Sequence, residues 1–236
     1  MVNYHILQAD SLTDDQIQQC ANLFSTKYGV WSKHVQPPLQ PGKNVRLTAN
    51  KLKKQFLFDD QCYASLAIDN GEHVGHALYR VFSTPELGEV RWITQLVVKR
   101  EHRHRGIGQQ LVYNCLGTTW RAAGLASCNP YAVKALERAS GLKCNLELSQ
   151  QHGPSILQCS NLSYLPKEVD VHVNALQSHS YIDTNYFVDH DEVLDALNKV
   201  DIWRLGDNLP EGYEFLHSCS GPVCHDRLNF NIAHAH

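Results

Sequence analysis

A basic, glycine-containing run, RHRGIG at residues 103–108, carries the clearest chemistry in this chain of 236 residues. The stretch before it, Trp92 to Val98, is rich in β-branched and aromatic residues, which favour a strand. The stretch behind it places Ile107, Leu111 and Cys115 four residues apart, the spacing of one helix face. The run is therefore predicted to join the end of a strand to the start of a helix.

Such a junction can bind an anion through its backbone. The first N–H groups of a helix have no partner inside the helix and lie at the positive end of its dipole. Gly106 and Gly108 have no side chain, so a ligand can approach the backbone closely. Arg103 and Arg105 add charge and directional donors. We predict a phosphate site suited to a pyrophosphate; the alternative is a surface turn with solvated arginines.

Two common phosphate-binding loops are excluded by their spacing. The chain contains no GxxxxGK[ST] motif, so it has no P-loop. It contains no GxGxxG motif either, so it lacks the dinucleotide fingerprint. The pattern that remains is R-x-x-G-x-G directly after a valine-rich strand.

The elements before this loop follow from periodicity, caps and turns. A capping box at Thr13-x-x-Gln16 opens a helix, and Asn70-Gly71 is a strong hairpin turn. The expected order is a strand at Tyr4–Ala9, that first helix, a second helix at Leu47–Phe58, and two strands at Tyr63–Asp69 and Val74–Phe82 that lead by hairpins into the central strand.

After the loop helix, a short strand is expected at Gly124–Cys128, parallel to the central strand because a right-handed crossover joins the two. Asn129-Pro130 then caps a further helix, which Gly141 ends. Leu142–Leu148 alternates apolar and polar residues and is predicted to be a strand, and Ser155–Cys159 is another candidate strand.

The loop, this order of elements from Tyr4 to Cys159, and the sequence Asn129-Pro130-Tyr131-Ala132 resemble the GNAT family of acetyltransferases. The resemblance implies a mixed α/β fold with a mostly antiparallel central sheet flanked by helices. It also implies an enzyme, an N-acetyltransferase with acetyl-CoA as acyl donor, in which two parallel strands part near Leu96 and Cys128 and the pantetheine arm pairs with the open strand edge.

The resemblance assigns residues to both substrates. The coenzyme would be bound by the central strand, the loop and the second motif, at Leu96, Val97, Val98, Arg103, His104, Arg105, Gly106, Ile107, Gly108, Gln109 and Asn129. The acceptor would be lined by Tyr28, Trp31, Trp92 and Thr94.

The chain departs from the family pattern in its proton-transfer groups. Trp92 and Thr94 occupy the strand face where many members carry Glu or His, and neither is a base. Leu136 and Glu137 stand where many members carry a Tyr that protonates the leaving thiolate. His76, Glu89 and Cys128 are further candidates, but a structural role is the favoured interpretation of each. No catalytic residue is assigned.

Composition excludes other classes of function. A net charge of −3 gives no global support for nucleic-acid binding, and no apolar run approaches membrane-spanning length. The first residues lack a signal-peptide pattern, so we expect a cytoplasmic chain with no membrane partner. The eight cysteines are expected to be free thiols. Neither they nor the fourteen histidines show a zinc-binding spacing, so no metal is expected.

The expected domain organisation is an acetyl-CoA-binding core at residues 1–160 and a C-terminal extension at residues 161–236. Within the extension, Asp189-x-x-Glu192 predicts the start of a helix, and Glu214–His217 is a candidate strand. The extension is expected either to help shape the acceptor pocket or only to cover the sheet.

Four functional hypotheses follow. The leading one is acetylation of the primary amine of a small molecule. The alternatives are acetylation of a protein or peptide amine, binding of acyl-CoA without catalysis, and transfer of a longer acyl group. Turnover with any amine separates the catalytic hypotheses from the binding one.

Overall fold

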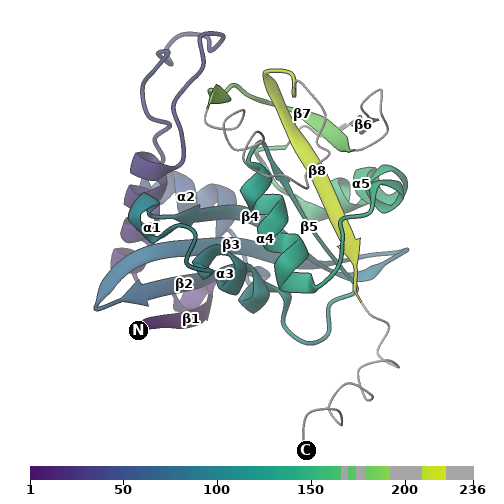
Figure 1. Cartoon of the computed structure of the whole chain (residues 1–236), viewed down its shortest axis with the longest axis horizontal. Helices are drawn as coiled ribbons and strands as arrows, with labels where there is room; N and C mark the ends of the chain where they lie inside the picture. The colour runs from purple at the N-terminus through teal and green to yellow at the C-terminus, as the bar shows by residue number, and fades with distance from the viewer. Residues whose placement is uncertain (166–169, 174–178, 192–208, 222–236) are drawn as a thin grey trace, which may run out of the picture.

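The computed structural model describes residues 1–165, 170–173, 179–191 and 209–221 of the chain (Figure 1). Within these residues, eight strands form one sheet in the order β1-β2-β3-β4-β5-β8-β7-β6. The strands are β1 (Val2–Gln8), β2 (Cys62–Asp69), β3 (Glu72–Thr84), β4 (Gly88–Val98), β5 (Ala122–Ser127), β6 (His172–Val173), β7 (Ser180–Tyr186) and β8 (Gly212–Ser220). All neighbours are antiparallel except β4 and β5, which are parallel as predicted.

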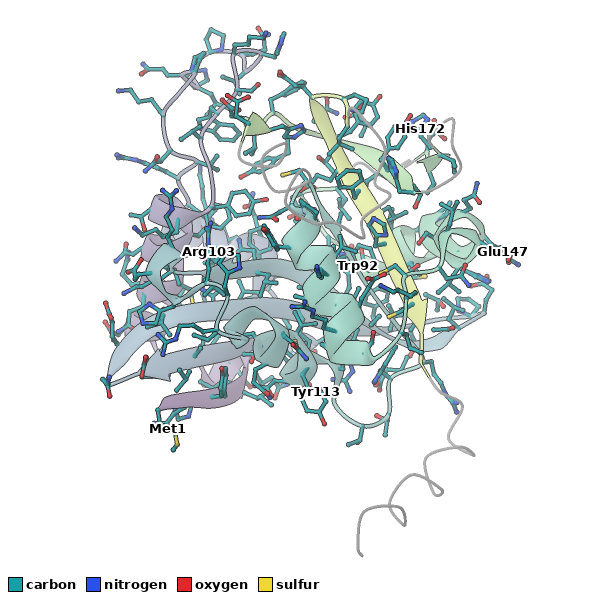
Figure 2. The ribbon with its side chains drawn as sticks, viewed as in Figure 1. Met1, Trp92, Arg103, Tyr113, Glu147 and His172 are labelled. Carbon is teal, nitrogen blue, oxygen red and sulfur yellow. The ribbon has the colours of Figure 1, made fainter. Side chains whose placement is uncertain are left out.

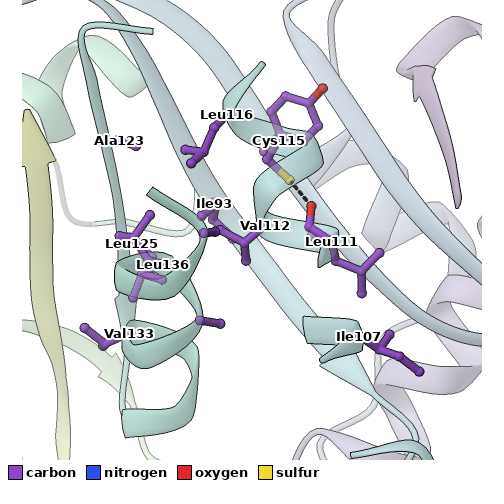
Figure 3. Packing of buried hydrophobic residues seen from close by; sticks show 14 of the residues in the cluster. Ile93, Ile107, Leu111, Val112, Cys115, Leu116, Ala123, Leu125, Val133 and Leu136 are labelled. Atoms are coloured by element: carbon purple, nitrogen blue, oxygen red, sulfur yellow. Dashed lines mark hydrogen bonds between the residues drawn. The ribbon is translucent and has the colours of Figure 1, made fainter. Parts of the chain in front are cut away.

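Helices cover both faces of the sheet. They are α1 (Asp14–Lys27), α2 (Ala49–Phe56), α3 (Ile107–Leu116), α4 (Pro130–Ser140) and α5 (Leu146–Ser160). Helices α3 and α4 pack on one face through a core that includes Ile93, Leu111 and Leu136 (Figure 3). Helices α1, α2 and α5 pack on the other face, against the strands that carry Leu78 and Trp92. The predicted fold class, a mixed α/β fold with a mostly antiparallel sheet, is confirmed.

The local signals for the first part of the chain are confirmed. The Thr13 hydroxyl accepts from the backbone N–H of Gln16 at 3.2 Å, and the Gln16 side chain accepts from the Thr13 N–H at 2.9 Å, so the capping box is complete. Helix α4 begins after Asn129 and ends at Gly141, whose φ is 71°. In each case a short polar or flexible residue satisfies helix-end groups that have no partner inside the helix.

Two predicted strands are wrong. Leu142–Leu148 and Ser155–Cys159 are coil and helix, because a single helix, α5, begins at Leu146 and extends to Ser160. The Asn145 side chain caps it by accepting from the Leu148 N–H at 3.1 Å. Gly153 allows this helix to lie close to β8, since a Cβ at that position would meet Leu216 Cδ2 at 2.8 Å. Cap chemistry and close packing therefore outweighed a short alternating pattern.

The C-terminal third extends the sheet. The predicted strand at Glu214–His217 is confirmed as part of β8, which pairs with β5 on one side and β7 on the other. The helix predicted after Asp189 lies outside the described residues. The division into a core at 1–160 and an extension at 161–236 stays a prediction.

The sheet is also irregular at two positions, one with an extra residue in β3 and one with an extra residue in β4. Between β2 and β3 the register shifts at Ala67 and Ile68, and between β3 and β4 it shifts at Leu78 and Tyr79. Such bulges bend a strand and re-aim its side chains. No helix among the described residues is long and apolar enough to cross a membrane.

Candidate active site

The loop between β4 and α3 has the geometry of an anion site. Its path is fixed where the Lys99 N–H donates to Val74 O at 2.9 Å, and a single turn of 3-10 helix follows at Arg100–His102. His104 and Gly106 then take left-handed conformations, with φ of 61° and 78°. Successive residues of alternating hand turn their N–H groups toward one side of the backbone and form a concave donor surface.

The N–H groups of residues 104–109 are free to bind a ligand. Within the described part of the chain, none of them donates a hydrogen bond, and the first donor after them is the Gln110 N–H, which donates to Gly106 O at 3.0 Å. A Cβ at Gly106 would meet no atom within 4 Å, and a Cβ at Gly108 would touch only Val98 Cγ2 at 3.9 Å. The space beside the two glycines is therefore open, as a bound pyrophosphate requires.

The two arginines of the loop have different surroundings. The Arg103 guanidinium donates to Val98 O and to Lys27 O, each at 3.2 Å, so it ties the loop to the ends of β4 and α1 (Figure 2). The Arg105 side chain is 51% exposed and lies 3.4 Å from the Asp69 carboxylate. Arg105 is therefore the more available of the two for a ligand anion.

The second predicted coenzyme motif lies beside the loop. Asn129 caps α4, and its side-chain oxygen accepts from the Tyr131 N–H at 2.9 Å. The Tyr131 ring meets the His104 ring edge to face, with centroids 5.5 Å apart. The structure thus brings the start of α4 beside the loop at residues 103–108. That both segments bind the coenzyme stays a prediction.

Strands β4 and β5 part halfway along the site. Their parallel pairing runs from Val90 and Ala122 to Ile93 and Leu125 and then stops. Beyond that point β4 still pairs with β3 from Leu96 to Val98, but its other edge has no strand partner in the described residues. A peptide-like arm can add to such an edge. The resemblance implied a separation near Leu96 and Cys128, three residues beyond this last pair.

The bulge in β4 fixes Thr94. Leu78 pairs with Gln95 and Tyr79 with Ile93, so Thr94 is the extra residue. Its hydroxyl donates to Leu78 O at 3.1 Å. Trp92 on the same strand is 1% exposed and packs in the core near the middle of the sheet (Figure 2). Their predicted roles in lining the acceptor site stay predictions.

Glu214 is the functional candidate that the sequence analysis missed. It lies on β8, one residue beyond the last pair of β5 and β8, Ser127 with Phe215. That position is three residues along β8 from His217, the partner of Leu125 at which the pairing of β4 and β5 ends. The Glu214 side chain is buried, with the residue 7% exposed. Burial raises its pKa to about 7, and a hydrogen bond from Thr184 opposes that shift. A carboxyl with a pKa near 7 can exchange a proton at neutral pH.

Aromatic side chains surround this carboxyl. Burial first, and the Glu214 charge second, raise the pKa of Tyr28, Tyr164 and Tyr186, so all three hydroxyls stay protonated at neutral pH. The Tyr28 and Tyr186 rings meet with centroids 6.1 Å apart, and Trp31 meets Tyr186 at 5.3 Å. The predicted acceptor residues Tyr28 and Trp31 are thus brought together on the Glu214 side of the sheet.

A cavity of about 440 Å³ continues from this aromatic group. Most of its lining is apolar, and Tyr186 belongs both to the cavity and to the surroundings of Glu214. The lining residues come from the segment between α1 and α2 and from the end of β7: Trp31, Val35, Gln36, Pro37, Pro38, Leu39, Asn185, Tyr186 and Phe187. Glu214 itself is not among the lining residues, and Tyr186 is the lining residue whose pKa the Glu214 charge raises.

The other proton-transfer candidates have structural surroundings. Burial lowers the pKa of His76 to about 3, and its ring contacts Gln95. Glu89 binds Arg91 at 2.8 Å, and Glu137 accepts from the Cys144 N–H at 3.1 Å. Burial, with the Glu214 charge, raises the pKa of Cys128 to about 12, so it is a neutral thiol. These contacts favour structural roles for all four side chains.

The sequence does contain a signal for Glu214. The segment Tyr213-Glu214-Phe215-Leu216 places a carboxylate among large apolar residues in a strand, and buried carboxylates are uncommon unless paired or functional. The signal is weak without the neighbouring strands, because the same four residues fit an exposed edge as well.

Comparison with known proteins supports one family. The acetyltransferase (GNAT) family profile matches residues 22–141, which is half of the chain. No curated protein matches the chain. This chain belongs to the acetyltransferase (GNAT) family and is an acyltransferase of that type.

Three solved structures illustrate the similarity. An aminoglycoside acetyltransferase from an uncultured soil metagenomic sample is 18% identical over 48% of this chain and 66% of its own, with a TM-score of 0.35. Diaminobutyrate acetyltransferase EctA from Paenibacillus lautus is 12% identical over 92% and 94%, with a TM-score of 0.41. Naa50 from Arabidopsis thaliana is 14% identical over 92% and 98%, with a TM-score of 0.46.

Proposed function

We propose that the chain transfers the acetyl group of acetyl-CoA to the primary amine of a small molecule, and that Glu214 takes the proton of that amine. The observation that carries the proposal is a buried carboxyl with a pKa of about 7 on β8, three residues beyond the level at which β4 and β5 part. The proposal keeps the predicted donor and adds the base that the sequence analysis left unassigned.

The donor site would use backbone more than side chains. The free N–H groups of residues 104–109, with Arg105 beside them, would hold the pyrophosphate, and the unpaired edge of β4 from Leu96 to Val98 would hold the arm. Acetyl-CoA supplies the acetyl thioester when bound. The rest of the chemistry is the deprotonation and placement of the amine.

Glu214 suits that deprotonation at neutral pH. A primary amine with a pKa near 10 is almost wholly protonated at pH 7 and is then no nucleophile. A carboxyl with a pKa of about 7 is partly ionised there, and a buried carboxylate attracts an ammonium group before it accepts its proton. The protonated hydroxyls of Tyr28 and Tyr186 can donate hydrogen bonds to groups held near Glu214.

The cavity supports a small acceptor with an apolar body. Its volume of about 440 Å³ falls within the range of small-molecule sites, about 300–1,000 Å³. Aromatic and proline side chains form most of its wall, and such a lining favours an aryl or alkyl amine over a polyhydroxylated or polycationic one.

Turnover assays with several chemical classes of amine test this function. Release of free thiol from acetyl-CoA would be followed with aryl-alkyl amines, aminosugars, polyamines and peptides of free N-terminus. We expect turnover with aryl-alkyl amines, and loss of most of it in Glu214→Gln but not in the control Glu147→Gln, an exposed carboxylate on α5. If the protein prefers peptides, the small-molecule acceptor is wrong and the acceptor is a peptide amine. Saturable acetyl-CoA binding without turnover of any amine would overturn it.

A further inference from the structure

A buried cluster of Cys20, His73 and His76 lies apart from the residues proposed for acyl transfer. Cys20 is on α1, and the two histidines are on β3. The three residues are 1%, 9% and 0% exposed. One thiol sulfur and one nitrogen from each imidazole all lie within 4.8 Å of one another. The cluster offers three soft or borderline donor atoms to one point in the core.

The bulge in β3 is what places both histidines on one face. Residues three apart in a regular strand point to opposite faces. Here Ile68 pairs with His73 and Ala67 with Gly75, so Val74 is an extra residue between them. The His73 and His76 rings consequently stack, with centroids 5.5 Å apart and planes 21° apart. Bulges are common where a side chain must be re-aimed for a function.

Three of the four imidazole nitrogens in this cluster lack hydrogen-bond partners. Neither ring nitrogen of His73 has one, and His76 Nδ1 has none. The carbonyls of Gly75 and Gln19 lie near enough to His73 to raise its pKa, against the larger lowering by burial, without forming hydrogen bonds of ordinary geometry. A buried polar atom without a partner costs about 1–3 kcal/mol, so such a group calls for an explanation.

Gln95 orients one of these ligands. Its side-chain oxygen lies 3.3 Å from His76 Nε2, and Gln95 is 4% exposed. When Nε2 donates its proton to that oxygen, His76 Nδ1 carries the lone pair, and Nδ1 is the nitrogen left without a partner. Hydrogen bonds of this kind, from the far nitrogen of a histidine to an acceptor, are the usual support of metal-bound imidazoles.

Without an ion the cluster is uncharged. Burial lowers the pKa of both histidines and raises that of Cys20 to about 12. Two neutral imidazoles already have the lone pairs that a metal needs, and only the thiol must lose a proton.

We propose that Cys20, His73 and His76 bind one Zn²⁺ ion. Sulfur and imidazole nitrogen are the ligands that Zn²⁺ prefers, and water would complete a tetrahedron. On binding, the Cys20 proton leaves to solvent as the sulfur–zinc bond forms, and no redox step is involved. With Zn–S of about 2.3 Å and Zn–N of about 2.0–2.1 Å, tetrahedral donor atoms lie about 3.5 Å apart, so the 4.8 Å limit here leaves each separation to shorten by at most about 1.3 Å.

The ion would connect α1 to β3 beneath the phosphate loop. The bulge residue Val74 accepts the hydrogen bond of the Lys99 N–H, and Lys99 opens that loop. Zinc binding would therefore stabilise the fold at the base of the donor site, and its effect is measurable without any acyl transfer.

Metal titration of the full chain tests the site. Chelator-treated protein would be titrated with Zn²⁺ against a chromophoric chelator, and separately with Co²⁺, which gives an intense near-ultraviolet band when a thiolate binds it. We expect one equivalent of each metal, the thiolate band with Co²⁺, and a higher melting temperature with Zn²⁺. Gln95→Leu should weaken affinity about 10–100-fold, as loss of a supporting hydrogen bond does elsewhere.

Paired cysteine variants make the test specific. Cys20→Ala should lose the thiolate band and stoichiometric binding, whereas Cys115→Ala, which removes an equally buried thiol on α3, should keep both. Circular dichroism would establish that each variant is folded, and Gln95→Leu provides the test if Cys20→Ala is not. Absence of saturable binding by the folded wild type, or full-affinity binding by Cys20→Ala, would overturn the proposal.

Discussion

At the scale of single residues, burial gives Glu214 its chemistry. The carboxyl is held among aromatic and apolar side chains, and its pKa of about 7 results from that desolvation. The carboxylate of Glu147, at the start of α5, is exposed. The difference between them can be measured in two ways, through rate and through stability.

The rate should depend on the ionisation of Glu214. Glu214→Gln removes the proton acceptor with little change in size, so we expect kcat/KM to fall by about 10²–10⁴-fold, the usual contribution of a general base. In the wild type the rate should rise with pH up to about 7 and then level off, and this rise should vanish in the variant. Steady-state assays from pH 5 to 9 check both, and a similar rise in the variant would rule out Glu214 as the base.

The same burial should cost stability. A folded-state pKa of about 7, against 4.5 for an ordinary Glu, means that the folded state favours the protonated form. The stabilisation is complete below pH 4.5 and is lost as pH rises through 7, and its size is about 3 kcal/mol. The free energy of unfolding of Glu214→Gln should therefore exceed that of the wild type by more at pH 8 than at pH 5. Urea unfolding of both proteins at pH 5 and pH 8 measures these free energies. The same difference between variant and wild type at both pH values would contradict the prediction.

Arg105 should contribute to coenzyme binding directly. Its side chain is half exposed and reaches Asp69 only at 3.4 Å, so it can turn to a ligand phosphate. We expect Arg105→Glu to weaken acetyl-CoA binding about 10–100-fold, since a hydrogen bond to a charged group contributes about 1.5–3 kcal/mol. Calorimetric titration beside Arg46→Glu, an exposed arginine outside the loop, checks it. Equal affinities of the two variants would show that backbone groups alone hold the anion.

At the scale of elements, one substitution at the start of α3 should have opposite effects on stability and on coenzyme binding. Gly108 has ordinary backbone angles, and a Cβ there would make only an ordinary contact with Val98. Gly108→Ala should thus stabilise the helix by about 0.5–1 kcal/mol, because glycine is the poorer helix former. The added methyl would stand where the phosphates approach, so affinity for acetyl-CoA should fall.

Thermal melts and calorimetric titration of Gly108→Ala measure the two effects separately, with Gln110→Ala, two residues farther along the helix, as the control. A variant that is more stable and binds acetyl-CoA as tightly as the wild type would contradict the proposed position of the phosphates.

The same elements show which parts of the fold could be predicted. The capping box at Thr13, the Asn129 cap and the strand–loop–helix junction at Gly106 depend on contacts a few residues apart, and all are confirmed. Helix α5 was missed because its packing against Leu216 of β8 crosses many residues. Glu214 and the Cys20 cluster were missed for the same reason, since their partners meet only through the sheet.

At the scale of the whole molecule, β8 joins the two parts of the chain. It lies between β5 and β7, and Leu216 and Ile182 complete the core beneath α5. A chain ended at Ser160 would expose the edge of β5 and lose these apolar side chains, so we expect it to be insoluble or to aggregate. Expression of residues 1–160 beside the full chain tests this. A soluble fragment that binds acetyl-CoA would instead support the predicted boundary at residue 160.

The position of β8 also determines when during synthesis the enzyme can become active. Ala122 of β5 pairs with Ser220 of β8 and is synthesised almost a hundred residues earlier. One edge of β5 therefore stays unpaired while the intervening chain emerges from the ribosome. The proposed base arrives on the last described strand. Incomplete chains would therefore carry a donor loop without a working acceptor site, and they would depend on chaperones until β8 is inserted.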